Sequence, residues 1–185
     1  MNRRRLWVAR HAMPSIAPGH CYGALDVSAD AAATAHSAQQ LAQALPKSVQ
    51  IYHSPLQRCE QLAQALQGFR PDLASKPDPR LAEMNFGDWE DRPWSHIARA
   101  DIDAWVADFA TYRPGGGENL AAVLARVAAA LCAARQHPTD VLWITHAGVA
   151  RCVQWLEQSP CGTHPRADQW PLLAPAFGAW TVFAF

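Results

Sequence analysis

Apolar residues recur along this chain in two alternating patterns, one typical of strands and the other of helices. Short, mostly apolar runs predict buried strands, because a strand that is covered on both faces is apolar at most positions. These runs are 6–9, 49–52, 141–144 and 179–185. Helices are predicted where apolar residues recur every three or four positions. They cover 30–45, 55–66, 119–135 and 149–157. Strands that alternate with helices indicate an α/β fold, with a largely parallel sheet between helices.

Proline and glycine mark the ends of these elements. Pro46 ends the first helix, and Pro55 fits the first position of the second, with Ser54 as its N-cap. The prolines between 70 and 80 exclude a long helix there. Residues 86–117 are rich in Asp, Trp, Pro and Gly, so we predict loops and short helices beside the main sheet. With 185 residues, the chain is expected to form a single domain.

Polar residues that could take part in catalysis or binding follow the predicted strands. The first strand leads into Arg10 and His11, and the third leads into His146. The second strand is followed by Arg58, one helical turn further along. In parallel sheets, ligands bind beyond the carboxyl ends of the strands. We therefore expect these side chains to converge at one edge of the sheet.

This set of residue types suits phosphoryl transfer. The reaction needs a nucleophile and donors that neutralise the equatorial phosphate oxygens. A neutral imidazole such as His11 is a competent nucleophile, and the planar forks of Arg10 and Arg58 match two phosphate oxygens. His146 is a further donor, which would add charge stabilisation if it is cationic. Glu83 is the candidate proton donor, because apolar neighbours in the sequence favour its protonated form.

Each of these residues also has a structural interpretation. A histidine at a strand end is more often a hydrogen-bonded structural group, and Arg58 alone is best explained as a solvated helix residue. Glu83 alone carries little information. Only the joint arrangement favours a functional site. The other histidines are assigned structural roles: His20, His36, His53, His96, His137 and His164.

Two further stretches, one rich in glycine and one rich in tryptophan, could be taken for binding sites, but we assign them structural roles. Gly115–Gly117 lacks the lysine and spacing of a nucleotide-binding loop, so we interpret it as a flexible lead into the helix at 119. Trp89, Trp94 and Trp105 are predicted to pack in the core or in a cap. Stacking on a ring-shaped substrate is the alternative for these tryptophans.

Composition and charge narrow the possible partners. Apolar residues make up 50% of the chain and the formal net charge is +0, which gives no electrostatic reason to expect nucleic acid or an anionic membrane. No apolar run reaches the roughly 18 residues of a membrane span, and the apolar run after Arg3–Arg5 is too short for a signal peptide. The odd, scattered set of five cysteines indicates a reducing cytoplasm, and Cys161 with His164 is only half of a zinc motif.

Four motifs in order along the chain resemble those of the histidine phosphatase superfamily, also called phosphoglycerate mutase-like. They are Arg10–Ala12, Ser54–Cys59, Leu81–Glu90 and Thr145–Val149. The resemblance implies a three-layer α/β/α fold, with a mixed, mostly parallel sheet and a cap-like insertion over about 86–117. It also implies a two-step transfer without metal or cofactor. In that reaction His11 is the nucleophile, Glu83 the proton donor, and the phosphate ligands are Arg10, Arg58 and His146.

Within the superfamily the nearest likeness is to the α-ribazole phosphatases of cobalamin synthesis. Gly19–Gly23, Met84–Gly87 and Pro114–Glu118 carry this likeness. The chain departs from the family pattern at three places. Ala12 stands where Gly is commoner, Met13-Pro14 replaces a pair that often ends in Thr, and Asp91 stands where Gly commonly follows Glu90. These departures leave the expected chemistry intact and bear on the identity of the substrate.

The leading functional hypothesis is a phosphomonoesterase acting on a small phosphorylated metabolite, with α-ribazole 5′-phosphate first among the substrates. One alternative is a broad-specificity phosphatase, or a mutase that acts on sugar or glycerate phosphates. Another is an inactive phosphate-binding scaffold. The apolar C-terminal strand 179–185 is a possible homodimer edge.

Overall fold

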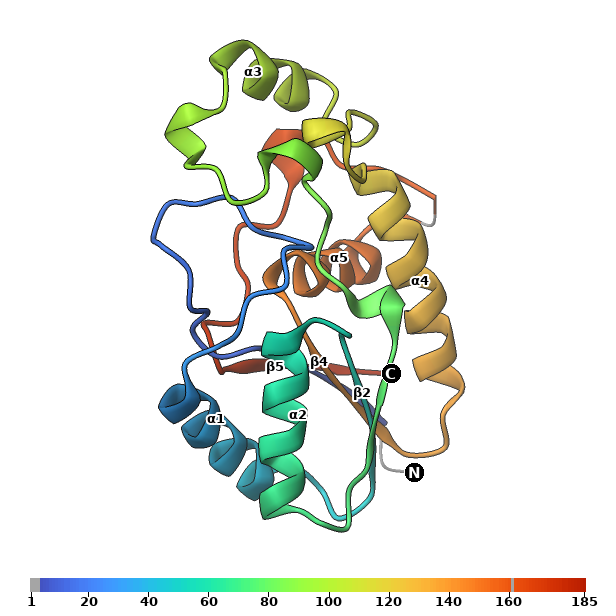
Figure 1. Ribbon diagram of the computed structural model, residues 1–185. Helices are drawn as coiled ribbons and strands as arrows, with labels where there is room; N and C mark the ends of the chain where they lie inside the picture. Colours follow the sequence, from blue (N-terminus) through green and yellow to red (C-terminus); the bar gives the residue numbers. More distant parts are fainter. Residues whose placement is uncertain (1–3, 161) are drawn as a thin grey trace.

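A computed structural model describes residues 4–160 and 162–185 (Figure 1). Cys161, and Arg3 of the N-terminal arginines, lie outside the described residues. Within those residues the strands form one sheet in the order β3-β2-β4-β1-β5. The strands are β1 Arg5–Arg10, β2 Val49–His53, β3 Ser75–Pro77, β4 Asp140–Thr145 and β5 Trp180–Ala184. All neighbours pair in parallel except β5, which is antiparallel to β1, so the sheet is mixed and mostly parallel as expected.

Helices cover both faces of this sheet, which confirms the three-layer prediction. The α-helices are α1 Ala31–Ala44, α2 Gln57–Phe69, α3 Arg99–Ala107, α4 Leu120–Gln136 and α5 Ala147–Gln158. Successive residues of β1 point to opposite faces: Leu6 and Val8 pack with residues of α4 and α5, whereas Trp7 and Ala9 pack with residues of α1 and α2. None of the helices in the described residues has the length and apolar character that crossing a bilayer requires.

The start of α2 corrects the sequence prediction. The helix begins at Gln57, its N-cap residue is Leu56, and no side chain caps it. Ser54 is therefore not the cap. Its hydroxyl instead lies 2.8 Å from Nε2 of His146, a residue 92 positions away in sequence. The cap prediction was wrong because the helix begins later than expected. The Ser54 hydroxyl still accepts from the Leu56 amide at 3.3 Å, but this amide precedes the helix.

Strand β3 was not predicted at all. It has three residues, ends in Pro77 and pairs only with β2 at one edge of the sheet. Proline cannot donate to a strand ladder, so it is tolerated only at such an edge. A segment this short has no alternating pattern to detect, and the prolines around it indicated only a break in helix.

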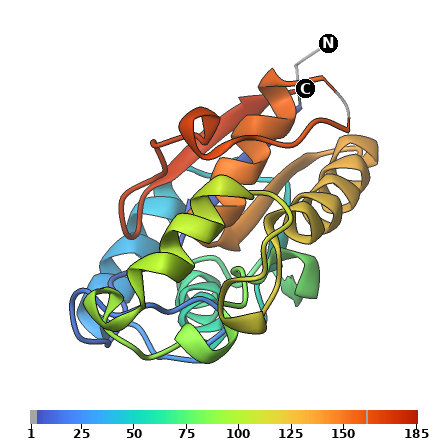
Figure 2. The ribbon, with the colours of Figure 1, turned by 90° about the horizontal axis from the view of Figure 1, so that it is seen from above.

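Residues 86–117, called the cap segment below, fold into short helices around α3. Figure 1 places α3 at the far end of the molecule from the strand β2, and Figure 2, seen from above, shows the same helix in front of α5. The glycine run is not a flexible lead. Gly115 adopts φ 56°, and a Cβ at this position would collide with the Phe86 carbonyl oxygen. Only glycine permits this left-handed, closely packed turn, which holds the two ends of the cap segment together.

Candidate active site

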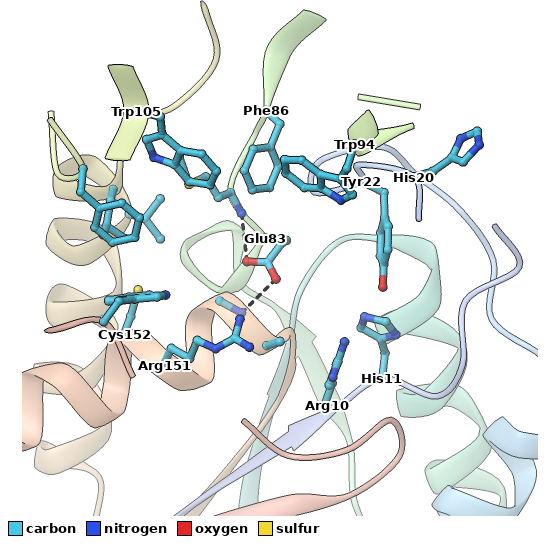
Figure 3. Close-up of a pocket in the computed structure, with 17 residues that line it drawn as sticks. Arg10, His11, His20, Tyr22, Glu83, Phe86, Trp94, Trp105, Arg151 and Cys152 are labelled. Carbon is cyan, nitrogen blue, oxygen red and sulfur yellow. Dashed lines mark hydrogen bonds between the residues drawn. The ribbon is translucent and has the colours of Figure 1, made fainter. Parts of the chain in front are cut away.

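A pocket lies where the carboxyl end of β1 meets the first turn of α5. Its volume is about 380 Å³, and Arg10, His11, Glu83 and Arg151 supply charged or ionisable groups on its lower side (Figure 3). The opposite side is built from aromatic residues of the cap segment and the C-terminal loop. The structure therefore brings together residues from distant parts of the chain, and it joins a polar floor to an apolar wall.

His11 follows β1 and is only 2% exposed. Its Nδ1 lies 2.7 Å from the Ala12 carbonyl oxygen, so Nδ1 carries the proton and donates it, and the lone pair is on Nε2. Burial, with the nearby charges of Arg58 and Arg10, lowers the pKa of His11 to about 3. The imidazole is therefore neutral at pH 7, which is the form that can act as a nucleophile.

Arg10 ends β1 and holds its guanidinium flat against an aromatic ring. The guanidinium carbon lies 3.7 Å from the centre of the Phe177 ring, and Nη1 donates to the Pro175 carbonyl at 3.2 Å. Within the described residues, its buried Nε has no hydrogen-bond partner. Figure 3 shows this guanidinium beside the His11 ring, at the floor of the pocket. The arrangement leaves a donor available to a bound anion.

Arg58 lies in the first turn of α2 and is fully buried rather than solvated. Nη1 donates to the Leu25 carbonyl at 2.8 Å and Nη2 donates to the Gly23 carbonyl at 2.6 Å. Its Nε, like that of Arg10, has no partner among the residues that the structure describes. Burying a charge is costly unless it is paired, and these carbonyls offset only part of that cost. The cavity itself is not lined by Arg58, so its role in binding an anion stays a prediction.

His146 precedes α5, and its ring centre lies 5.1 Å from that of His11. Besides the Ser54 contact, its Nε2 lies 3.5 Å from the Cys59 sulfur. Burial, together with the charge of Arg58, lowers the pKa of His146 well below its usual value. The lowered pKa favours the neutral form of His146, so the charge stabilisation that a cationic form would add is not supported.

Glu83 lies in the pocket between the aromatic wall and Arg151 (Figure 3). Its Oε1 accepts a hydrogen bond from the Met84 amide at 3.1 Å, and its Oε2 accepts one from the Gly148 amide at 3.0 Å. A Cβ at position 148 would collide with the Glu83 carboxylate, so glycine is required there. The walls near Glu83 are apolar as expected, whereas its carboxyl oxygens are held by backbone donors.

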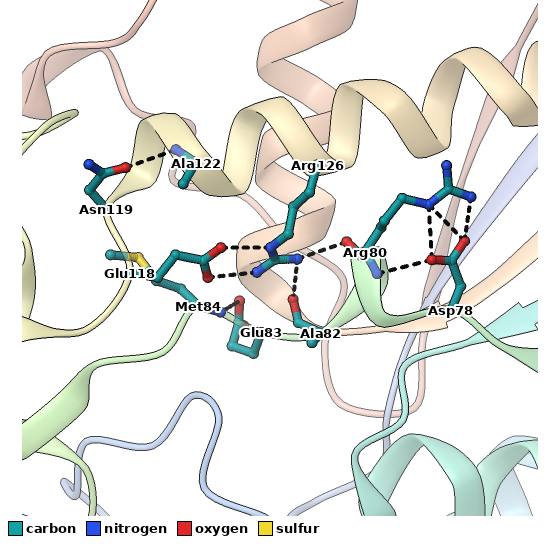
Figure 4. A network of polar contacts seen from close by, with 9 residues as sticks. All are labelled: Asp78, Arg80, Ala82, Glu83, Met84, Glu118, Asn119, Ala122 and Arg126. Carbon is teal, nitrogen blue, oxygen red and sulfur yellow. Dashed lines mark hydrogen bonds and ion pairs between the residues drawn. The ribbon is translucent and has the colours of Figure 1, made fainter.

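A polar network anchors the segment that carries Glu83 (Figure 4). Arg126 of α4 donates from Nη1 to the carbonyls of Arg80 and Ala82, both at 2.7 Å. Its Nε and Nη2 bind the two oxygens of Glu118 at 2.9 and 3.0 Å. One mostly buried guanidinium thus fixes the position of the backbone immediately before Glu83 relative to the start of α4.

We expect Arg126→Met to destabilise the protein by about 2 kcal/mol, because it leaves one carboxylate and two carbonyls partly buried without their donor. The matched control is Arg135→Met, since Arg135 pairs with Glu157 at a more exposed site. Loss of that pair should cost less than about 1 kcal/mol. Urea unfolding of both variants measures the difference, and equal losses would contradict a structural role for the Arg126 network.

Several pocket residues were missed by sequence reasoning. Tyr22, Arg151 and His20 line the cavity, although His20 was assigned a purely structural role. Trp94 and Trp105 also line it, so they are not only packing residues, whereas Trp89 is buried in the cap. Helical spacing relates Arg151 to another cavity residue. It follows Ala147 by one turn of α5, so the two residues lie on the same face of the helix.

Comparisons with known proteins agree with this geometry. The model of the histidine phosphatase superfamily (branch 1) matches residues 6–167. A mycobacterial glucosyl-3-phosphoglycerate phosphatase structure is 26% identical, with a TM-score of 0.78 and coverage of 98% of this chain and 90% of that chain. A structure described as mycobacterial hydrolase 2 is 25% identical, with a TM-score of 0.82 and coverage of 100% and 83%.

A candidate α-ribazole-5′-P phosphatase from Escherichia coli is 24% identical, with a TM-score of 0.80 and coverage of 99% of this chain and 91% of that chain. This likeness concerns the fold. No curated protein matches the sequence significantly. The family model, in contrast, extends over most of the chain and includes the segments that carry Arg10, Glu83 and His146. The chain belongs to the histidine phosphatase superfamily, branch 1, and is a phosphatase.

Proposed function

We propose that this phosphatase hydrolyses a phosphomonoester through a phosphohistidine formed on His11. One observation carries the proposal. A buried, neutral imidazole with its Nε2 lone pair available lies near two guanidinium groups whose buried Nε atoms have no partner among the described residues, and it shares a pocket with a carboxyl group. A phosphoryl group at this position would satisfy those donors, and its transfer needs both a nucleophile and an acid.

The proposed reaction has two steps. In the first, Nε2 of His11 attacks phosphorus, the bond from phosphorus to the leaving oxygen breaks, and protonated Glu83 gives its proton to that oxygen. In the second, water attacks the phosphohistidine, Glu83 takes a proton from the water, and the bond from phosphorus to Nε2 breaks. Arg10, Arg58 and His146 hold the phosphoryl oxygens throughout, by donating hydrogen bonds where charge develops. No metal takes part in this scheme.

The aromatic wall supports a substrate whose leaving group carries a flat apolar ring. Trp94 and Trp105 lie parallel, with an interplanar angle of 10° and ring centres 6.4 Å apart. Phe86 meets both tryptophans edge-on. Such surfaces favour a substrate that carries an aromatic ring over sugar or glycerate phosphates, which have none. We therefore propose α-ribazole 5′-phosphate, a benzimidazole riboside phosphate, as the leading substrate.

A comparison of kcat/KM for α-ribazole 5′-phosphate, glycerol phosphate and 3-phosphoglycerate tests this assignment. We expect a preference of at least about 10-fold for the aromatic ester, since one well-placed aromatic contact contributes about 0.5–1.5 kcal/mol and the wall offers several. Equal values would indicate a broad-specificity phosphatase. Isomerised phosphoglycerate, formed with a bisphosphate primer, would indicate a mutase.

We expect Trp105→Ala to raise KM for α-ribazole 5′-phosphate by about 10-fold, because the substitution removes ring stacking. KM for glycerol phosphate should change little, which would also show that the variant remains folded. Trp155→Ala is the matched control, since Trp155 lies in α5 outside this cavity. An equal rise in KM for both esters would argue against recognition of a ring by Trp105.

A further inference from the structure

The carboxylate of Glu90 lies in a concentration of backbone donors. Its Oε1 accepts from the amides of Phe86 at 2.8 Å and Ala24 at 3.0 Å. Its Oε2 accepts from the amides of Gly23 at 2.8 Å and Leu25 at 3.0 Å. A carboxylate that accepts several backbone hydrogen bonds forms strong, charge-assisted contacts. Glu90 thus ties the cap segment to the loop of residues 23–25.

The same short loop binds an opposite charge through its carbonyl groups. Gly23 and Leu25, whose amides donate to Glu90, accept from the two terminal nitrogens of Arg58. The loop backbone therefore lies between a carboxylate and a guanidinium. One peptide group is bonded to both charges, because its Gly23 carbonyl accepts from Arg58 and its Ala24 amide donates to Glu90. Each charge polarises this peptide group in the sense that strengthens its bond to the other charge. Glu90 and Arg58 are coupled through this loop without direct contact.

The packing of the loop leaves little freedom for another arrangement. A Cβ on Gly23 would collide with the Met84 carbonyl oxygen and with the Phe86 ring. The loop backbone therefore lies directly against the segment that follows Glu83. The two loop carbonyls are the partners that the structure gives to the Arg58 terminal nitrogens. A displacement of this loop would therefore move the tip of Arg58.

We propose that Glu90 is a positioning residue that holds Arg58 in place for phosphate through the backbone of residues 23–25. The inference rests on the proposed function, in which Arg58 binds the phosphoryl group.

Attachment of the cap segment alone does not require this carboxylate. The backbone of Cys21 already accepts from the Asp91 amide and donates to the Arg92 carbonyl, both at 2.8 Å. Asp91 supports this pairing by adopting φ 61°, the left-handed conformation for which Gly is the usual residue. The cap segment therefore has a backbone connection to the 20–22 stretch. The Glu90 side chain adds hydrogen bonds that fix the position of residues 23–25.

The test is a double-mutant cycle on kcat/KM with p-nitrophenyl phosphate, using Glu90→Gln, Arg58→Ala and the double variant. Glu90→Gln keeps the shape but removes the charge and directs an amide group at backbone donors. We expect it to lower kcat/KM by about 10- to 100-fold, as small displacements of catalytic groups do. If Glu90 acts through Arg58, the double variant should be no slower than Arg58→Ala alone. Losses that multiply would overturn the proposal.

A second measurement needs no change at Arg58, which is buried. Competitive inhibition by inorganic phosphate should weaken in Glu90→Gln, because the misplaced guanidinium binds the anion less well. An unchanged inhibition constant, or unchanged kcat/KM, would overturn the proposal. The matched control is Glu157→Gln, remote from the pocket and paired with Arg135, which should behave like the wild type. Full activity of Arg58→Ala would instead refute the role of Arg58 in the proposed function, a separable outcome.

Discussion

Replacing His11 with Ala is expected to lower kcat on phosphomonoesters by about 10⁴-fold or more, the scale seen when an enzyme loses its nucleophile. His146 is not expected to take its place, because its described contacts direct Nε2 to Ser54 and Cys59. Inorganic phosphate should still bind, since the guanidinium groups of Arg10 and Arg58 remain. Steady-state kinetics and equilibrium phosphate binding measure the two effects separately.

The matched control is His36→Ala, because His36 is an exposed residue of α1. This variant should retain normal turnover. In the wild-type protein, rapid quenching should trap phosphate that is labile to acid and stable to base, and peptide mapping should place it on His11. Full activity of His11→Ala on any phosphomonoester would refute the proposed nucleophile. Absence of a trapped phosphoryl group would favour direct attack by water or an inactive scaffold.

Replacing Glu83 with Gln is expected to slow the first step by about 10²- to 10⁴-fold for alkyl phosphates, the usual contribution of a general acid. The first turnover of p-nitrophenyl phosphate should be much less affected, because nitrophenolate leaves without a proton. Hydrolysis of the phosphohistidine should also slow, since the same group activates water. Stopped-flow measurement should therefore show a burst of about one equivalent of nitrophenol, followed by slow turnover.

Glu157→Gln also serves as the control for this substitution and should show no burst beyond that of the wild type. Equal slowing of the first turnover for alkyl and nitrophenyl esters would contradict the role of Glu83 as an acid. Such a result would indicate that Glu83 acts only through its hydrogen bond to the Gly148 amide, which holds the start of α5.

The main sheet and the helices against it were predictable because their signals are local. The apolar run 6–9 and the continuous burial of its residues follow from covering a strand on both faces. Asp30 and Asn119 begin α1 and α4 by accepting from the Ala33 and Ala122 amides, as their side chains favour at such positions. No tertiary information is needed for either signal.

The candidate site was predictable to a lesser degree. A largely parallel sheet indicated that residues at the carboxyl ends of its strands would meet, and the ring centres of His11 and His146 do lie close together. The direction of each side chain was not accessible. Arg58 is buried against loop carbonyls rather than solvated, and Ser54 faces His146 rather than capping a helix. Those outcomes depend on partners distant in sequence, so the catalytic roles themselves remain predictions.

By itself, the sequence determined the α/β class, the placement of most helices and strands, and the family motifs, because periodicity and short motifs are properties of neighbouring residues. Only the tertiary structure decided that Trp94, Trp105, Tyr22 and Arg151 share a cavity. It also decided that Glu90 and Arg58 bind the same loop, Glu90 through its amides and Arg58 through its carbonyls. The physical reason is that a cavity, and a loop bound by two charged side chains, are set by the packing of segments far apart in the chain, which no local pattern encodes.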